Sequence, residues 1–199
     1  MADTKRVFMP FSKLFSRTAR RRYSADSLYL ALVALAREPR FYTELGVPDT
    51  VDGRFEMLSL FVYLALRRLR REGEASARFS QELFDTMFAD MDQSLRELGA
   101  GDLGVAPRIK RMAEGFYGRI AAYDKALEEG DGALVTALSR NLYGTVKPDE
   151  AVLARMAAIV RQLDGLFAGL PAEALYAGEP QVPLTPVLDG QPAAEGARI

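Results

Sequence analysis

The chain has 199 residues, the length of one ordinary domain with tails. Apolar residues make up 49% and charged residues 27%, which are the proportions of a globular protein and exclude a fully unfolded chain. The net charge is −1, and histidine and cysteine are both absent. Disulfides, the usual zinc, haem and iron–sulfur sites, histidine bases and cysteine nucleophiles are therefore excluded, and we expect no cofactor.

The first 23 residues form a basic arm. Seven lysines and arginines stand against Asp3 alone in residues 1–22, which gives a charge of +6. Apolar side chains lie among them, a composition typical of segments that bind anionic membrane surfaces. The predicted membrane contacts are Phe8, Phe11, Lys13, Leu14, Phe15 and Arg17. A flexible arm without a membrane role, or the targeting peptide of an imported protein, would have the same composition, so these alternatives stay open.

From residue 24 to 169 the spacing of apolar residues is helical nearly throughout, and no stretch alternates as a strand would. We therefore predict an all-α fold, a single compact domain with about six main helices. The expected helices cover about residues 24–38, 51–69, 80–98, 107–129, 131–143 and 148–167, with a short helical piece over 40–45. The longest apolar run, Met57 to Leu66, is too short for the ~20 residues of a membrane span and fits a buried core helix.

The C-terminal residues 170–199 are rich in proline, alanine and glycine and have no helical periodicity. We expect them to form a disordered tail.

The segment Gly99 to Gly104 matches the pattern G-x-G-x-x-G of dinucleotide-binding proteins. That pattern works where a strand turns into a helix, and here the preceding segment is helical. We therefore do not interpret it as a nucleotide site.

Arginines and glycines share one side of the helix predicted after Pro107. Gly115 and Gly118 lie inside this helix, where glycine costs about 1 kcal/mol relative to alanine, so their presence indicates close approach of another group. Arg108, Arg111 and Arg119 beside them could bind a partner's carboxylates with two hydrogen bonds each. Alternatively, the glycines accommodate a neighbouring helix of the same domain and the arginines pair with Asp90 and Glu97.

Two stretches resemble one known family. Residues 41–57 read FYTELGVPDTVDGRFEM, and residues 88–119 contain FADMDQSLRELG, GDLGV and KRMAEGFYGR in that order. Both are similar to the signatures of the ubiquinol–cytochrome c chaperone family, and the chain looks like a bacterial member. Gly53, Arg54 and Phe55 in the first signature would fix the turn from loop to helix.

The resemblance implies an all-helical, non-enzymatic protein that binds newly made cytochrome b and assists assembly of the cytochrome bc complex. Mitochondrial relatives work near the ribosome with a small partner protein, and for this chain those two contacts are open. We expect a cytoplasmic location at the inner membrane, or a mitochondrial one in a eukaryote. Adding two signature carboxylates to the stripe gives the predicted partner-binding residues: Asp90, Asp102, Arg108, Arg111, Gly115, Gly118 and Arg119.

Two further classes of function remain. A lipid or quinone carrier would line a cavity with Phe55, Phe61, Phe84, Phe88, Met91, Phe116 and Tyr117. A ribosome-binding or RNA-binding adaptor would use the run Arg20 to Arg22, although a short basic arm is weak support for it and DNA is not an expected partner. An enzyme is least favoured, because no set of acid, base and nucleophile converges.

Overall fold

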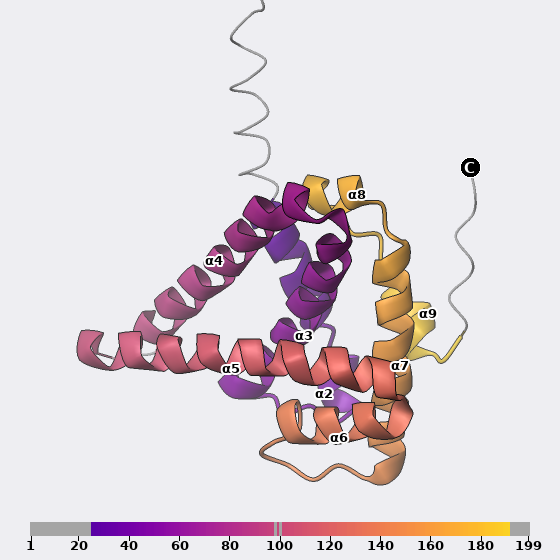
Figure 1. Cartoon of the computed structure of the whole chain (residues 1–199). Helices are drawn as coiled ribbons and strands as arrows, with labels where there is room; N and C mark the ends of the chain where they lie inside the picture. The colour runs from indigo at the N-terminus through magenta and orange to yellow at the C-terminus, as the bar shows by residue number, and fades with distance from the viewer. Residues whose placement is uncertain (1–24, 98, 100, 192–199) are drawn as a thin grey trace, which may run out of the picture.

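The computed structural model describes residues 25–97, 99 and 101–191, apart from the side chains of Asp102 and Leu103. These residues form helices and connecting loops without a strand, so the predicted all-α class is confirmed. A first helix is described over residues 25–36. It is followed by α2 (Arg40–Thr43), α3 (Val51–Leu69), the 3-10 turn η1 (Arg70–Glu72), α4 (Glu74–Glu97), α5 (Asp102–Glu129), α6 (Asp131–Asn141), α7 (Glu150–Gly169), α8 (Ala172–Ala177) and α9 (Leu184–Leu188) (Figure 1).

Helix α3 lies at the centre of the core. Nearly all of its residues from Phe55 to Ala65 are buried, as expected for the apolar run in the sequence. The Thr50 side chain caps its start by accepting a hydrogen bond from the Gly53 amide at 3.1 Å. A side chain at Gly53 would meet the Pro48 carbonyl oxygen at 2.0 Å, so this signature glycine allows loop and helix to pack together. No helix in the described part of the chain is long and apolar enough to cross a membrane.

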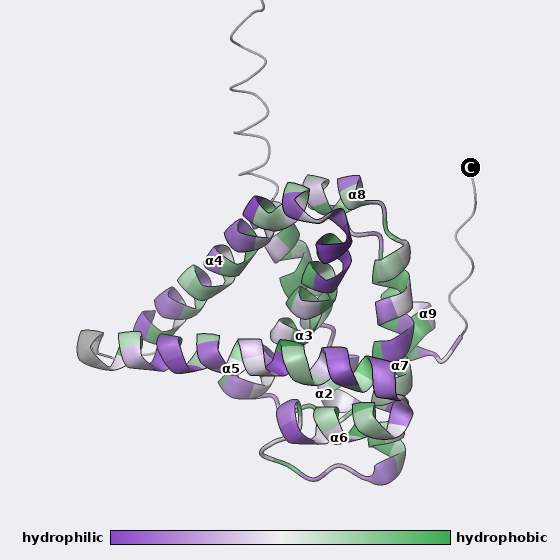
Figure 2. Ribbon diagram, in the orientation of Figure 1, coloured by the Kyte–Doolittle hydropathy of each residue, from purple (hydrophilic) through white to green (hydrophobic). Residues whose placement is uncertain are grey.

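The helices α4 and α5 diverge from a shared end, and α5 crosses in front of α3 to reach α7 (Figure 1). Gly130, with φ of 113°, then reverses the chain so that α6 packs back along α5. Both α4 and α5 alternate between hydrophobic and hydrophilic residues along their length, as amphipathic helices do (Figure 2).

Two helices begin earlier than the sequence pattern predicts. Helix α4 begins at Glu74 rather than near residue 80, in a segment where Ser76 is buried and donates to the Leu69 carbonyl at 2.8 Å. Helix α5 begins at Asp102 rather than Pro107, because the fully buried Val105 anchors its first turns. The glycine pattern is thus a connection between two helices, with Gly101 as the N-cap of α5, and the strand that a dinucleotide site requires is not there.

The disordered tail predicted from residue 170 needs correction for residues 170–191. This segment carries α8 and α9, whose Leu175, Val187 and Leu188 are buried in the core. Its apolar residues are too widely spaced by proline and glycine to show helical periodicity, yet its larger ones pack on the core formed by the earlier helices. Residues 192–199 lie outside the described part.

Candidate partner-binding site

Three of the predicted arginines line one cleft. Arg108, Arg111 and Arg119 extend from α5, and Arg140 joins them from the end of α6, around a cavity of about 500 Å³ that the first turn of α3 closes on one side. We call this the arginine cleft. The prediction that the α5 arginines lie together is in agreement with this geometry.

The innermost arginine of the cleft is held by an acid of α3. The Arg119 guanidinium donates two hydrogen bonds to the Glu56 carboxylate and lies 5.9 Å from the centre of the Phe55 ring. The two side chains of the ion pair are only 21% and 12% exposed. Burial raises the pKa of Glu56, and it outweighs the opposing effect of Arg119. Arg119 is therefore fixed in place and largely neutralised.

Gly115 explains how Arg119 reaches Glu56. A Cβ atom at position 115 would lie 2.5 Å from a terminal nitrogen of Arg119, one turn further along α5. The glycine therefore makes room for a side chain of its own helix. Gly118 has open space where a Cβ would be, so it plays no such part.

The outer arginines of the cleft form weaker ion pairs or none with the described acidic residues. Arg108 makes a 3.4 Å ion pair with the exposed Asp52. Arg111 and Arg140 are exposed and have no acidic partner among the described residues. The side-chain amide nitrogen of Asn141, also in the cleft, is buried without a hydrogen-bond acceptor. The arginines of the cleft thus carry positive charge in excess of its two carboxylates.

A shallow trough continues from the arginine cleft between α5 and α6. It has a volume of about 620 Å³ and shares Arg119, Arg140 and Asn141 with the cleft. Its floor consists of small residues: Gly115, Gly118, Ala122, Ala126, Ala133, Thr136 and Ala137. Small side chains at this spacing allow the backbone of another helix to come close.

Asp90, which we grouped with the arginines, lies elsewhere. Its carboxylate accepts a hydrogen bond from the Tyr29 hydroxyl at 2.6 Å, and it lines a separate groove. The alternative in which Asp90 and Glu97 pair with the α5 arginines is also wrong, since Asp52 and Glu56 of α3 are the partners. Glu97 accepts a hydrogen bond from Gln93 of its own helix at 2.9 Å.

The remaining predicted residues lie outside the described part of the chain. Asp102 begins α5, but its side chain is not described. The same holds for the whole basic arm, including Phe8, Phe11, Lys13, Leu14, Phe15 and Arg17.

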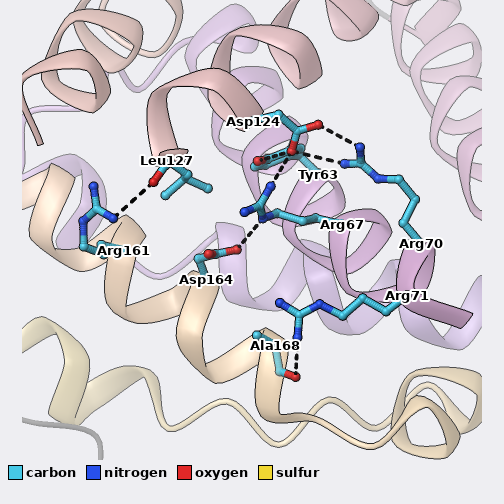
Figure 3. A network of polar contacts seen from close by, with 9 residues as sticks. All are labelled: Tyr63, Arg67, Arg70, Arg71, Asp124, Leu127, Arg161, Asp164 and Ala168. Atoms are coloured by element: carbon cyan, nitrogen blue, oxygen red, sulfur yellow. Dashed lines mark hydrogen bonds and ion pairs between the residues drawn. The ribbon is translucent and has the colours of Figure 1, made fainter. Parts of the chain in front are cut away.

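Further along α5, Asp124 forms a polar network with other helices (Figure 3). Its carboxylate accepts hydrogen bonds from the Tyr63 hydroxyl at 2.8 Å and from Arg67 and Arg70 at 2.7 and 2.8 Å. Arg67 also binds Asp164 of α7 at 2.9 Å. Burial opposes ionisation of Asp124, but the hydrogen bonds from Arg70, Tyr63 and Arg67 prevail, so the pKa of this carboxyl is below its usual value.

The residues proposed to line a lipid cavity mostly pack against one another. Phe84 contacts Phe88, Phe116 and Tyr117 with ring centres 4.6 to 5.9 Å apart, and Phe61 is fully buried. Phe55 and Met91 line a groove between the first helix, α3 and α4, which has a volume of about 310 Å³. The other aromatic residues of this set mostly pack against one another in the described chain.

Two residues of the cleft escaped the sequence reasoning. Arg140 comes close to Arg119 because the two lie ten and eleven residues on either side of the Gly130 turn, so the register of the hairpin could have indicated it. Glu56 gave no such signal, since its position opposite Arg119 depends on how α5 crosses α3.

Comparison with known proteins places the chain in a family. Residues 43–182 match the family model described as ubiquinol-cytochrome C chaperone. The chain belongs to this family. Over 139 residues, 70% of each protein, it is 27% identical to ubiquinol-cytochrome-c reductase complex assembly factor 1 of Xenopus laevis. It is 29% identical over 126 residues to the mitochondrial protein CBP3 of Saccharomyces cerevisiae, of which the match covers 37%.

The fold also has a solved counterpart in this family. The crystal structure of the Cbp3 homolog from Brucella abortus superimposes with a TM-score of 0.74 at 40% sequence identity, over 85% of this chain and 94% of that one. The match of the family model to residue 182 includes α8, in agreement with the packing of that helix on the core.

Proposed function

We propose that this protein assists assembly of the ubiquinol–cytochrome c reductase complex by binding newly made cytochrome b in the arginine cleft. Membership of the chaperone family and the names of the relatives support the assembly role. The observation that supports the site is the pair Arg111 and Arg140, two exposed arginines that line one cleft and have no carboxylate partner among the described side chains.

The chemistry of the cleft favours a client segment that carries carboxylates. A guanidinium binds a carboxylate through two parallel hydrogen bonds, and such charge-assisted bonds are roughly twice as strong as neutral ones. The ion pair of Arg119 and Glu56 holds the floor of the cleft in place, so Arg111 and Arg140 can bind a client carboxylate without a rearrangement of the floor. In this proposal the cleft acts by binding, because its two carboxylates, Asp52 and Glu56, are already paired with arginines.

The trough beside the cleft suits the nature of such a client. A membrane protein such as cytochrome b presents helices before it is fully assembled, and the small residues between α5 and α6 allow a helix backbone to approach. In this proposal a client helix lies along the trough, and acidic residues at its end reach Arg111 and Arg140. The basic arm would hold the protein at the inner membrane, where cytochrome b is inserted.

The test is capture of cytochrome b from membranes by the tagged protein. The variant Arg111→Glu/Arg140→Glu is compared with wild type and with Arg71→Glu/Arg78→Glu, a control of equal charge change at exposed arginines away from the cleft. We expect wild type and control to capture cytochrome b and the cleft variant to capture at least about tenfold less, the effect of losing about 1.4 kcal/mol of binding free energy.

The possible failures are distinguishable. If the folded cleft variant captures as much cytochrome b as wild type, the site is wrong while the function stands. If wild type captures none and complex levels are normal in cells without the protein, the proposed function is wrong.

A further inference from the structure

An apolar groove lies on the other side of Phe55 from the arginine cleft. It runs between the first helix, α3 and α4, and Tyr29, Val33, Leu58 and Met91 are among the side chains that line it. Most of its exposed lining is apolar, and charged side chains stand at its rim, Arg37 and Arg54 on one side and Asp90 and Glu97 on the α4 side. A groove with an apolar floor and a charged rim suits an amphipathic segment.

The α4 wall of this groove is acidic. The helix carries six acidic and two basic residues. Arg78 and Arg96 pair with Glu82 and Asp92 on their own helix, four residues apart. Two of its acids, Asp90 and Glu97, line the groove and accept hydrogen bonds from the neutral donors Tyr29 and Gln93. This side of the groove therefore favours a basic occupant.

The chain itself carries a segment of that chemistry next to the groove. Residues 1–22 have a charge of +6, and among the basic residues lie the apolar side chains of Phe8, Met9, Phe11, Leu14 and Phe15. The segment joins the first helix, which supplies Tyr29 and Val33 to the groove and is tied to α4 by a hydrogen bond from Thr86 to Asp26 at 2.9 Å.

The distances permit this segment to reach the groove. The groove lies roughly 6 to 18 Å from Ala25 along the first helix, at about 1.5 Å per residue. Leu14 is eleven positions before Ala25 in the sequence, a stretch that can span at most about 40 Å. The segment can therefore turn back and place its apolar residues against Leu58 and Met91.

We propose that residues 8–15 of this chain dock in the groove between the first helix, α3 and α4, with their basic neighbours against the acidic wall of α4. In the docked state the aromatic side chains that we expect at the membrane are covered by the protein's own body. The groove would then control when the arm is available for a membrane. This inference does not depend on the client site.

Because the chain lacks cysteine, engineered thiol pairs can test the docking in the full-length protein. Leu14→Cys is combined either with Ser94→Cys, inside the groove, or with Gln81→Cys. Gln81 is exposed on the same helix, closer to the Thr86 contact with the first helix than Ser94 is, but outside the groove. A free arm would reach position 81 at least as easily as position 94.

We expect the intramolecular disulfide to form at least about tenfold faster with Ser94→Cys than with Gln81→Cys, equivalent to about 1.4 kcal/mol of preference. Adding Glu97→Lys at the rim should slow the Ser94→Cys reaction by about two- to fivefold, the range of an exposed ion pair. If the disulfide forms as fast or faster with Gln81→Cys than with Ser94→Cys, and Glu97→Lys does not change the rate, the arm is not docked in the groove. Disulfides that join two molecules at position 94 would overturn the proposal in favour of a second copy of the chain as the occupant.

Discussion

The two halves of α5 use charged residues in opposite ways. Near its C-terminal end, Asp124 accepts from Tyr63, Arg67 and Arg70, so that one carboxylate is surrounded by donors from α3 and η1. In its N-terminal half, Arg108 and Arg111 share a cleft with Arg119, which lies just past the midpoint of the helix, and with Arg140 of α6. Arg111 and Arg140 lack an acidic partner in the described structure. The charge of Asp124 is therefore paired within the molecule, whereas the charges of Arg111 and Arg140 have no acidic partner in its described part.

This difference separates a structural role from a binding role. A saturated network contributes to the folded state and gains nothing from a ligand. Unmatched arginines contribute little to stability, because exposed charges are solvated by water, but they can bind a carboxylate brought from outside. The expected effects of mutations therefore differ in kind at the two ends of the helix.

The largest expected effect is at the saturated end. Asp124→Asn should lower the free energy of unfolding by about 2–3 kcal/mol, because Arg67 and Arg70 lose their shared carboxylate in a partly buried position. Urea unfolding measures this change. If Asp124→Asn and wild type have the same free energy of unfolding, the network around Asp124 does not have the structural role assigned to it.

At the unmatched end, Arg111→Ala/Arg140→Ala should leave the free energy of unfolding within about 0.5 kcal/mol of wild type. The same urea titration provides the value, with Asp124→Asn as the reference for a disrupted network. A loss as large as that of Asp124→Asn would mean that both arginines have structural partners, contrary to the account.

The glycines of α5 give a smaller, matched pair of effects. Gly118→Ala should stabilise the protein by about 0.5–1 kcal/mol, since alanine favours the helix and the space beside it is open. Gly115→Ala should gain none of this, because its methyl group displaces the Arg119 guanidinium from Glu56. Equal stabilisation by both substitutions, measured by thermal unfolding, would contradict the assigned role of Gly115.

The smallest effect concerns pH. The pKa of Asp124 is lower in the folded protein than in the unfolded chain, so its contribution is complete above the ordinary aspartate pKa of about 4 and is lost as the pH falls through the folded value. Wild type should therefore lose stability below about pH 4 more steeply than Asp124→Asn. Parallel curves for the two proteins would show that Asp124 does not titrate as described.

Local patterns allowed much of the fold to be predicted. The apolar run of α3, the Thr50 cap and the Gly130 turn are encoded within a few residues, and all three are present. Residues 170–191 escaped prediction because α8 and α9 have no amphipathic period of their own and depend on a core made by other helices.

The candidate site was predictable only where it lies on one helix. The arginines of α5 share a face through helical spacing, and they do line one cleft. Asp90 was grouped with them from its place in the family signature, but the signature spans two helices that diverge, and only the tertiary arrangement decides where its side chain lies. The positions of Glu56 and Arg140 in the cleft likewise depend on the tertiary arrangement of the helices.

The most direct test of the central claim is a site-specific crosslink from the cleft. A photo-crosslinking amino acid is placed at Thr145, which lines the arginine cleft, and in a second protein at Glu173, an exposed position of α8. If the unmatched arginines mark the client site, illumination of cells that are making cytochrome b will attach it to position 145 and not to position 173. Attachment at position 173 alone, with position 145 unmodified in a folded protein, would contradict the account.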